Sequence, residues 1–162
     1  MPHRPGSEQR EGERAIAYWE DQATRLGANA TVGALTPDPA AMRSEEWSHR
    51  FVVASDSVIE DATLILYGAN FARLLGIPPE RKPPLAIRRW VPDRLLQVFL
   101  DGCSDAFKLN TPVRVEGEVP REHGQRELFR AAFMPIGSDS GKPVRLAFGA
   151  FNSRLADSSV SA

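Results

Sequence analysis

The chain has 162 residues, of which 42% are hydrophobic and 25% are charged, and its formal net charge is -1. This composition supplies one domain with a packed core, and the near-neutral charge excludes a global basic field for a nucleic-acid backbone. No apolar run approaches the roughly 20 residues of a membrane helix, and the polar N-terminus lacks the apolar segment of a signal peptide. The single cysteine, Cys103, excludes an internal disulfide and a multi-cysteine metal site. We therefore expect a cytoplasmic protein with no nucleic-acid or membrane partner.

The first predicted element is an amphipathic helix at residues 11–26, after a polar stretch at residues 1–10 that we expect to be disordered. Its apolar side chains recur at alternating spacings of three and four residues, as in a coiled-coil seam. They are Ile16, Trp19, Ala23 and Leu26, with Tyr18 widening the face. An isolated helix of this length is marginal in water, so the stripe needs cover from its own domain or from a second molecule. With the linker that follows it, the flanking segment comprises residues 11–37.

Residues 38–154 are predicted to form one α+β domain, and residues 155–162 a disordered tail. The elements expected in the domain are a short helix from Asp38 to Trp47, strands at 51–54 and 64–67, a short helix at 71–75, a longer helix at 92–108, and strands at 113–119, 127–136 and 144–151. The abrupt change from the buried second strand to a helix, broken at Gly68, is the centre of this pattern. Short turns between the last three strands predict antiparallel pairing.

The longer helix has one face that narrows from large residues to small ones. It begins at Pro92, and the face comprises Leu95, Phe99, Gly102, Cys103 and Ala106. Another group is therefore expected to approach closely near Gly102 and Cys103. The last two strands are apolar on both faces, so both faces of the sheet need cover.

This order of elements resembles that of a PAS domain. The segments that carry the resemblance are FVVAS at 51–55, DATLILYGANFARLLG at 61–76, PDRLLQVFLDGCSDAF at 92–107, and the closing strands PVRVEGEV, RELFRAAFMPIG and PVRLAFGAFN. PAS domains often place an asparagine or similar residue where the second strand meets the helix, with a glycine soon after, and Asn70 and Gly76 occupy these places. The similarity covers about residues 47–154 and is closest to small stand-alone bacterial PAS proteins. It implies a five-stranded antiparallel sheet with helices cupped over one face.

The resemblance implies a non-catalytic sensory or regulatory module of bacterial signal transduction. Such a module acts through contacts with a histidine kinase or another signalling protein, and a small ligand in its cup is an open option. The residues expected to line the cup are Leu95, Phe99, Gly102, Cys103, Ala106, Val115, Met134 and Phe148. We also expect a homodimer, because a two-fold pairing of the N-terminal helix would bury its stripe. The residues expected in that interface are Ile16, Tyr18, Trp19, Ala23, Leu26, Phe129, Phe133 and Phe151.

No cofactor is expected. Light-sensing relatives of PAS domains form a flavin adduct through a cysteine in an asparagine-cysteine-arginine run, which this chain lacks, and Cys103 sits on a different helix. Haem-binding PAS domains commonly take a histidine from the longer helix, and residues 92–108 contain none. His49 and His123 are expected at the surface. No metal site is predicted.

Two further groups of charged residues each have two interpretations. Glu116 and Glu118 share one face of a strand, and a solvated face is favoured over a catalytic pair of carboxylates. The run Arg88-Arg89-Trp90 is either a spot for an anion or a partner, or a plain surface rim.

The alternative from another class is a small enzyme or ligand-binding protein on a cone-shaped α+β fold, similar to the ketosteroid isomerase-like family. That reading needs convergent polar groups inside a cavity, whereas the expected inward positions are mainly Val, Leu, Ala, Phe and Met. A purely structural dimerisation module is a third reading.

Overall fold

The computed structural model describes residues 7–26, 31, 35, 44–56, 58–137 and 145–157. Most of the predicted linker at 27–37 and of the predicted short helix from Asp38 lies outside the described residues. No helix in the described ranges combines the length and the apolar character that crossing a membrane requires.

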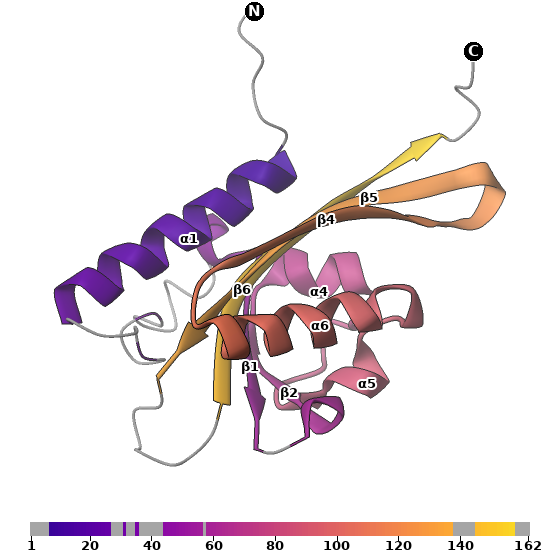
Figure 1. The fold of residues 1–162 in the computed structure, drawn as a ribbon. Coiled ribbons are helices and arrows are strands. Elements are labelled where there is room, and N and C mark those ends of the chain that lie inside the picture. The colour runs from indigo at the N-terminus through magenta and orange to yellow at the C-terminus, as the bar shows by residue number, and fades with distance from the viewer. Residues whose placement is uncertain are drawn as a thin grey trace, which may run out of the picture.

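A six-stranded antiparallel sheet forms the centre of the fold (Figure 1). Its strands are β1 (Arg50–Ser55), β2 (Thr63–Tyr67), β3 (Leu85–Ala86), β4 (Val113–Pro120), β5 (Gln125–Ile136) and β6 (Arg145–Asp157), in the spatial order β3-β2-β1-β6-β5-β4. The five predicted strands are all present, but the sheet has a sixth, because β3 adds to the edge of β2. A strand of two residues behind a proline-rich passage is too short to produce a readable alternation.

Two predicted boundaries differ from the structure. Strand β6 continues to Asp157, which pairs with Gln125 of β5, so residues 155–157 are strand and not tail. The backbone ladder with a long neighbouring strand extends β6 without any need for apolar side chains. The N-terminal helix α1 spans Ser7–Leu26 and begins inside the stretch that was expected to be disordered. Adding polar residues to a helix that is already held by packing costs little, since nucleation is the costly step.

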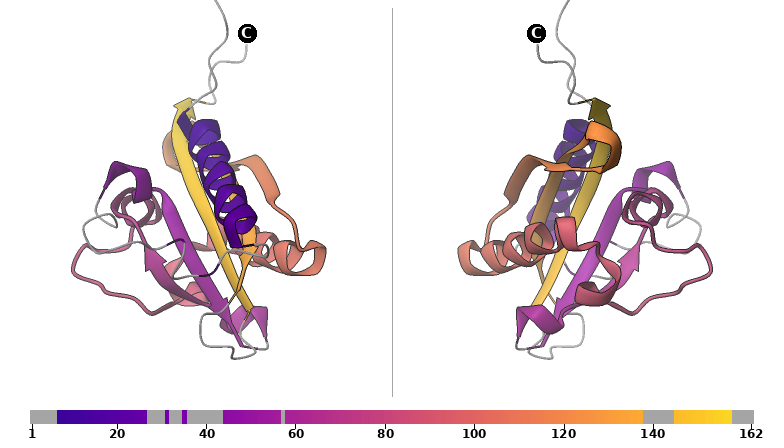
Figure 2. Two further views of the ribbon diagram at one scale, coloured as in Figure 1. Left: turned by 90° about the vertical axis from the view of Figure 1, so that its left-hand side faces the viewer. Right: turned by 90° about the vertical axis from the view of Figure 1, so that its right-hand side faces the viewer.

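Helices cover both faces of the sheet. The helices α4 (Ala69–Leu75), α5 (Ile87–Trp90) and α6 (Asp93–Leu109) lie on one face, and α1 lies across β5 and β6 on the other (Figures 1 and 2). Short 3-10 turns at Glu45–Trp47, Ile59–Asp61 and Glu122–Gly124 connect the elements. The prediction that both faces of the last two strands need cover is confirmed, because one molecule supplies both layers.

The corner between β2 and α4 depends on a close approach of two backbones. A Cβ on Gly68 would lie 2.1 Å from the carbonyl oxygen of Trp47, so only glycine fits there. The Gly68 N–H donates to the Arg50 carbonyl at 3.0 Å, and the Phe71 N–H donates to the Ser48 carbonyl at 2.8 Å. Both bonds join α4 to the start of β1. Gly76 then ends α4 in the left-handed conformation, at a φ of 75°.

Side chains divide the core into two clusters, one on each face of the sheet. The cluster under α4, α5 and α6 contains Phe51, Phe71, Phe99, Phe133 and Phe151 among its largest members. The cluster under α1 contains Ala15, Ile16, Trp19, Trp47, Ala132, Met134 and Phe148. Residues one apart on the same strand belong to different clusters, as the two-residue period of a strand requires.

The apolar stripe of α1 is buried against the sheet of the same molecule. Ile16 is 3% exposed and Trp19 is 8% exposed, and the Trp19 indole N–H donates to the Pro135 carbonyl at 2.7 Å. The guanidinium of Arg50 lies over the Tyr18 ring, 4.9 Å from its centroid. The sequence allowed the helix to pack on its own domain or on a second molecule. In the structure it packs on its own domain. The side chain of Leu26 lies outside the described residues.

The bond from Trp19 to Pro135 predicts a measurable stability change. Replacing Trp19 by Phe keeps an aromatic ring but leaves the buried Pro135 carbonyl without its donor, which costs about 1–3 kcal/mol. Urea unfolding of the full chain measures this difference. Glu20→Gln on the exposed side of α1 is the control, and its effect should stay within about 0.5 kcal/mol. A Trp19→Phe protein as stable as the wild type would contradict the role given to this bond.

Candidate functional site

The interior under the helices is filled by aromatic side chains. Phe99 is in contact with the rings of Phe51, Phe71, Phe133 and Phe151, at centroid separations of 5.3, 5.8, 5.7 and 5.5 Å. All five rings are fully buried. These five rings pack against one another in the region in which a cup ligand was expected.

The structure brings most of the predicted cup residues together. Leu95, Phe99, Gly102, Cys103 and Ala106 are all buried in the cluster under the helices, and Val115 packs against it. Met134 and Phe148 do not belong there, because they lie on the opposite face under α1. Their place in the cup was wrong.

The predicted dimer phenylalanines show the complementary error. Phe129, Phe133 and Phe151 were expected on the face covered by the N-terminal helix, and they lie in the cluster under α4, α5 and α6. Alternation along a strand sorts residues into two sets, but it does not say which set faces which layer. Gly102 is the sequence feature that could have assigned the two sets, because a glycine on a helix face leaves space for a large side chain on the strand opposite it.

Phe133 is the group that approaches closely at Gly102. A Cβ built on Gly102 would lie 2.3 Å from the Phe133 ring. Beside it, Cys103 is fully buried, and burial raises the pKa of its thiol to about 12. The thiol therefore stays protonated and unreactive at neutral pH.

Because Gly102 contacts Phe133, we expect the replacement of glycine by alanine to have opposite effects on stability at two glycines that lie in helices. Gly102→Ala overpacks the core and should destabilise the fold by about 1–3 kcal/mol. Gly12→Ala in α1 is the matched control, because its Cβ would be 3.8 Å from Ala132, at an ordinary contact distance. There the gain in helix propensity should stabilise the fold by roughly 0.5–1 kcal/mol. Thermal unfolding of both variants measures the signs, and a neutral Gly102→Ala would mean that the cup holds spare volume.

The surface is hollowed between α1 and the β4–β5 hairpin. A pocket of about 470 Å³ lies there, lined by Gly12, Glu13, Arg114, Val115, Glu116, Arg130, Ala131 and Ala132. The Nε and Nη2 atoms of Arg114 donate to Glu13 at 2.8 and 3.3 Å, and Arg130 pairs with Glu116 at 3.2 Å. The pocket is thus bordered by charges of both signs in ion pairs. The sequence had placed Glu116 on a solvated face, but it gave no signal for Glu13 or Arg114.

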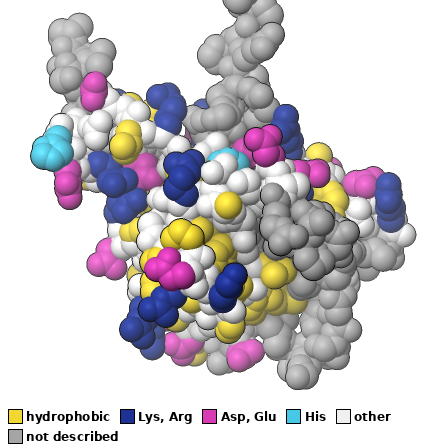
Figure 3. All heavy atoms as spheres, turned by 180° about the vertical axis from the view of Figure 1, so that it is seen from behind, with side chains coloured by type: hydrophobic (Ala, Val, Ile, Leu, Met, Phe, Trp, Pro, Cys, Tyr) yellow, Lys and Arg dark blue, Asp and Glu magenta, His cyan; other side chains and the backbone are white. Residues whose placement is uncertain are grey.

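Charges of both signs are also interspersed over the back of the molecule. Figure 3 shows lysine or arginine side chains next to acidic ones, including those on the projecting part that holds the hairpin. His123 lies in the hairpin turn and is exposed, as predicted. Such a mixed surface has no single-sign field for a polyanion.

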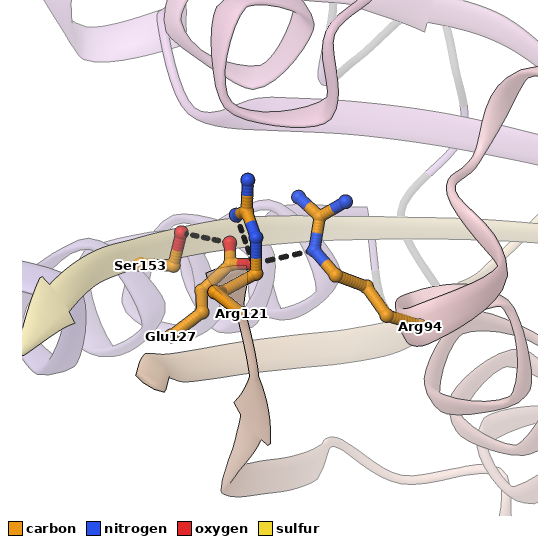
Figure 4. Close-up of polar contacts among 4 residues, drawn as sticks. All are labelled: Arg94, Arg121, Glu127 and Ser153. Atoms are coloured by element: carbon orange, nitrogen blue, oxygen red, sulfur yellow. Dashed lines mark hydrogen bonds and ion pairs between the residues drawn. The ribbon is translucent and has the colours of Figure 1, made fainter. Parts of the chain in front are cut away.

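A buried carboxylate joins three elements and the β4–β5 connection at the N-terminal end of α6 (Figure 4). Glu127 of β5 is 2% exposed and accepts hydrogen bonds from Arg94 at 2.7 Å, Arg121 at 2.9 Å and Ser153 at 2.6 Å. Burial by itself raises the pKa of Glu127, but the bonds from Ser153, Arg94 and Arg121 outweigh it and the pKa is lowered. Glu127 therefore stays ionised and holds α6 to the hairpin. Sequence reasoning missed this cluster, because its members are far apart in the chain.

The lowered pKa of Glu127 predicts an acid-dependent loss of stability. A depressed native pKa gives stability that is present above the unfolded value of about 4.3 and is lost as pH falls through the native pKa. Glu127→Gln removes this term, so its unfolding free energy should fall less than that of the wild type between neutral pH and about pH 3. Urea unfolding at both pH values measures the difference. Glu118→Gln, which removes an exposed partner of Arg126, should retain the wild-type dependence.

A second polar cluster fixes the start of α4. The Asn70 amide group lies 3.3 Å from His49 Nε2, and Asn70 Oδ1 accepts from Arg73 Nε at 3.3 Å. His49 Nδ1 lies 3.2 Å from the Phe151 carbonyl. The two contacts of the His49 ring are compatible when Nδ1 carries the proton and donates to the Phe151 carbonyl, which can only accept, while Nε2 accepts from Asn70. His49 was expected at the surface and is instead half-buried.

The remaining predicted groups stay at the surface. Arg88 and Arg89 are exposed on α5, and Arg88 pairs with Asp61 at 3.3 Å. The guanidinium of Arg81 lies 4.8 Å from the Trp90 ring. Within the described ranges, no three His, Cys, Asp or Glu side chains are grouped to hold a metal ion.

The solved structures to which this chain is similar include PAS domains. It is similar to a domain of an HTR-like protein from Haloarcula marismortui, with 15% identity over 64% of this chain and 96% of that one and a TM-score of 0.45. It is also similar to the PAS domain of Bordetella pertussis BvgS, with 12% identity over 65% and 74% of the two chains and a TM-score of 0.42. A variant of the fungal photoreceptor VVD is a third, with 16% identity over 63% and 75% and a TM-score of 0.40.

These likenesses concern overall fold alone. All three identities are at or below 16% and all three TM-scores are below 0.5, so no functional residue is transferred from these proteins. No protein-family model matches the chain, and no curated protein sequence matches it.

Proposed function

We propose that this chain is a non-catalytic PAS-type regulatory module that acts in bacterial signal transduction through protein contacts. The packed rings around Phe99 are the observation that carries this proposal, since they place the protein's own side chains at the centre of the expected cup. A hollow lies on the outside, between α1 and β4, and charged side chains border it. A surface of this kind suits the polar rim of a protein interface better than the enclosure of a small substrate.

The arrangement of the carboxylates supports a role without catalysis. A general acid or base needs a perturbed, water-shielded group facing a reaction space. Glu13 and Glu116 border the pocket, but each is paired with an arginine and is more than half exposed. Glu127 is shielded, yet three donors hold it and keep it ionised. The ketosteroid isomerase-like alternative needs polar groups that converge inside a cavity, whereas the carboxylates that border the described pocket are exposed and paired.

The absence of a cofactor is part of the proposal. Cys103 is fully buried with a raised pKa, so it cannot act as the thiolate that an adduct needs. The filled interior likewise favours a module without a resident ligand.

A homodimer and a second signalling protein, such as a histidine kinase, remain proposed partners, and a cytoplasmic location goes with them. The dimer surface needs correction, however. Ile16 and Trp19 cover their own sheet, and Phe133 and Phe151 lie under the helices. Ile16 and Trp19 can meet a second copy only if α1 leaves the sheet, and Phe133 and Phe151 stay covered by α4, α5 and α6 even then.

Native mass spectrometry with an absorbance scan tests this function. The purified full chain should show masses that are whole multiples of the polypeptide, and no stoichiometric band above about 350 nm, where bound flavins and haem absorb. The denatured chain from the same sample gives the reference mass. An additional mass that persists in every charge state and vanishes on denaturation would contradict the proposal and restore a ligand-binding reading.

A further inference from the structure

Strand β4 is the outer strand of the sheet on the side of the hairpin. It runs over eight residues, Val113–Pro120, and among the strands of the described part of the chain it pairs with β5 alone. In an antiparallel ladder, alternate residues of an edge strand direct their N–H and C=O groups away from the sheet. These groups can pair with another strand, which is why natural proteins either protect such edges or use them.

The side chains of β4 divide cleanly between the two faces. Val113, Val115 and Val119 pack against the cluster under α6. Arg114, Glu116 and Glu118 are exposed on the other face, the one that carries α1. Any strand that pairs with β4 therefore meets a valine row on one face and a charged row on the other.

We propose that a second copy of this chain pairs with β4 through its own β4, antiparallel and two-fold symmetric about Val115. In this register Val115 lies opposite Val115 of the second copy. Arg114 lies opposite Glu116 of the second copy, and by symmetry Glu116 lies opposite its Arg114. Two cross-strand pairs of opposite charge then flank the axis, with valines meeting on the other face. The inference rests on the homodimer of the proposed function and gives it an interface.

The neighbouring registers are all worse. With the axis at Glu116, Arg114 lies opposite Glu118 of the second copy on both sides, so two opposite-charge pairs remain, but Glu116 meets Glu116 on the axis. With the axis at Arg114, Arg114 meets Arg114 and no opposite-charge pair forms, and like charges directly opposite each other are destabilising. An axis at Gly117 sets Glu116 against Glu118 twice. If the axis instead passes between two residues, each residue lies opposite the sequence neighbour of its own counterpart in the second copy. A valine then meets a charged residue, because a slip of one position moves every side chain of a strand to the other face of the sheet. The sequence of β4 therefore selects one register.

Charges already present beside β4 extend the complementarity. Glu13 of α1 lies on the far side of Arg114, and Arg130 of β5 lies on the far side of Glu116. Across the joined edge the order becomes Glu13, Arg114, Glu116 of the second copy, and Arg130 of the second copy, so that the sign alternates at every step. All four side chains are exposed to some degree, so the pairs are worth little singly and act as a register key.

Sedimentation of the full chain and of charge-reversed variants tests the proposal. The wild type should be in monomer–dimer equilibrium. Arg114→Glu and Glu116→Arg should each raise the dimer Kd by roughly tenfold or more, because each sets like charges opposite each other on both sides of the axis. The double variant Arg114→Glu with Glu116→Arg restores opposite signs and should return the Kd to within roughly threefold of the wild type.

Matched controls separate this effect from a change in net charge. Arg88→Glu and Asp61→Arg make the same charge changes in an exposed pair away from β4, and they should leave the dimer Kd unchanged. Melting curves of all variants should stay close to the wild type, since the Arg114–Glu13 pair is exposed and such pairs contribute little to stability.

Cross-linking gives a second, independent readout. Residues opposite each other at the axis have Cα atoms about 4.5–5.5 Å apart, which lies inside the disulfide range of about 4.4–6.8 Å. Val115→Cys should therefore form a covalent dimer under copper–phenanthroline oxidation. Glu118→Cys should not, because residue 118 and its copy would be about 20 Å apart along the strand. The buried Cys103 keeps the wild type unlinked.

Each result decides the proposal. Weakening by both single reversals, rescue by the double variant and selective linking at residue 115 support it. A wild type that stays monomeric at the highest concentration measured overturns it together with the homodimer of the proposed function. A wild-type dimer that is indifferent to the single reversals, or is not rescued by the double variant, overturns the β4 pairing alone. A chain that is monomeric and free of ligand leaves the contact-based regulatory function standing without a dimer.

Discussion

The ladder between β5 and β6 is apolar on both of its faces, and the rest of the molecule is arranged to cover it. One face meets Phe99 and its neighbours under α6, and the other meets Ile16 and Trp19 of α1. Leaving either face in water would expose side chains that are each worth roughly 1.5–3 kcal/mol on burial. The N-terminal helix is therefore a structural layer of this domain and not an optional extension.

That constraint also decides where the molecule can meet others. Covering both faces consumes the apolar stripe of α1 and the phenylalanines of the last two strands. The surface left among the described residues includes polar side chains, the pocket between α1 and the hairpin, and the backbone edge of β4. The buried Glu127 cluster supports this remaining surface, because Arg94 and Arg121 hold α6 and the hairpin in a fixed relation. A rigid hairpin is a better binding edge than a mobile one, since less ordering entropy is lost on association.

The sequence predicted the elements far better than their assembly. Alternation and helical spacing gave five strands, α1, α4 and α6 close to their observed places, because those patterns record the local period of the backbone. The two sets of side chains on β5 and β6 were also separated correctly. Their assignment to layers failed, so Met134 and Phe148 were placed in the cup while Phe133 was placed outside it. The missing information was three-dimensional, namely that the ring of Phe133 fills the space left by Gly102.

The polar clusters were harder still to foresee. Arg94, Glu127 and Ser153 come from three elements, and no short spacing joins them. His49 and Asn70 were each noticed, but their contact depends on the close backbone approach at Gly68. A motif search reads neighbours in the chain, whereas these sites are built from neighbours in the sheet. The resemblance to PAS domains predicted the antiparallel sheet and the helices over one face, missed the sixth strand, and gave no information about these contacts.

Charged residues on an edge strand ordinarily protect it, and β4 shows why charge alone does not settle the matter. Repulsion protects an edge when the same sign recurs along the strand, because a second copy then meets its own charge in any register. In β4, Arg114 and Glu116 stand two residues apart on either side of Val115, so one register of self-pairing reverses the sign at each contact. Glu118 lies just beyond that pair and meets Glu116 in the register centred on Gly117, which it opposes, and Pro120 ends the strand without an N–H to donate. The same row of side chains therefore repels most alignments of a second copy and favours one. An edge strand can in this way resist non-specific pairing and still bind one partner specifically.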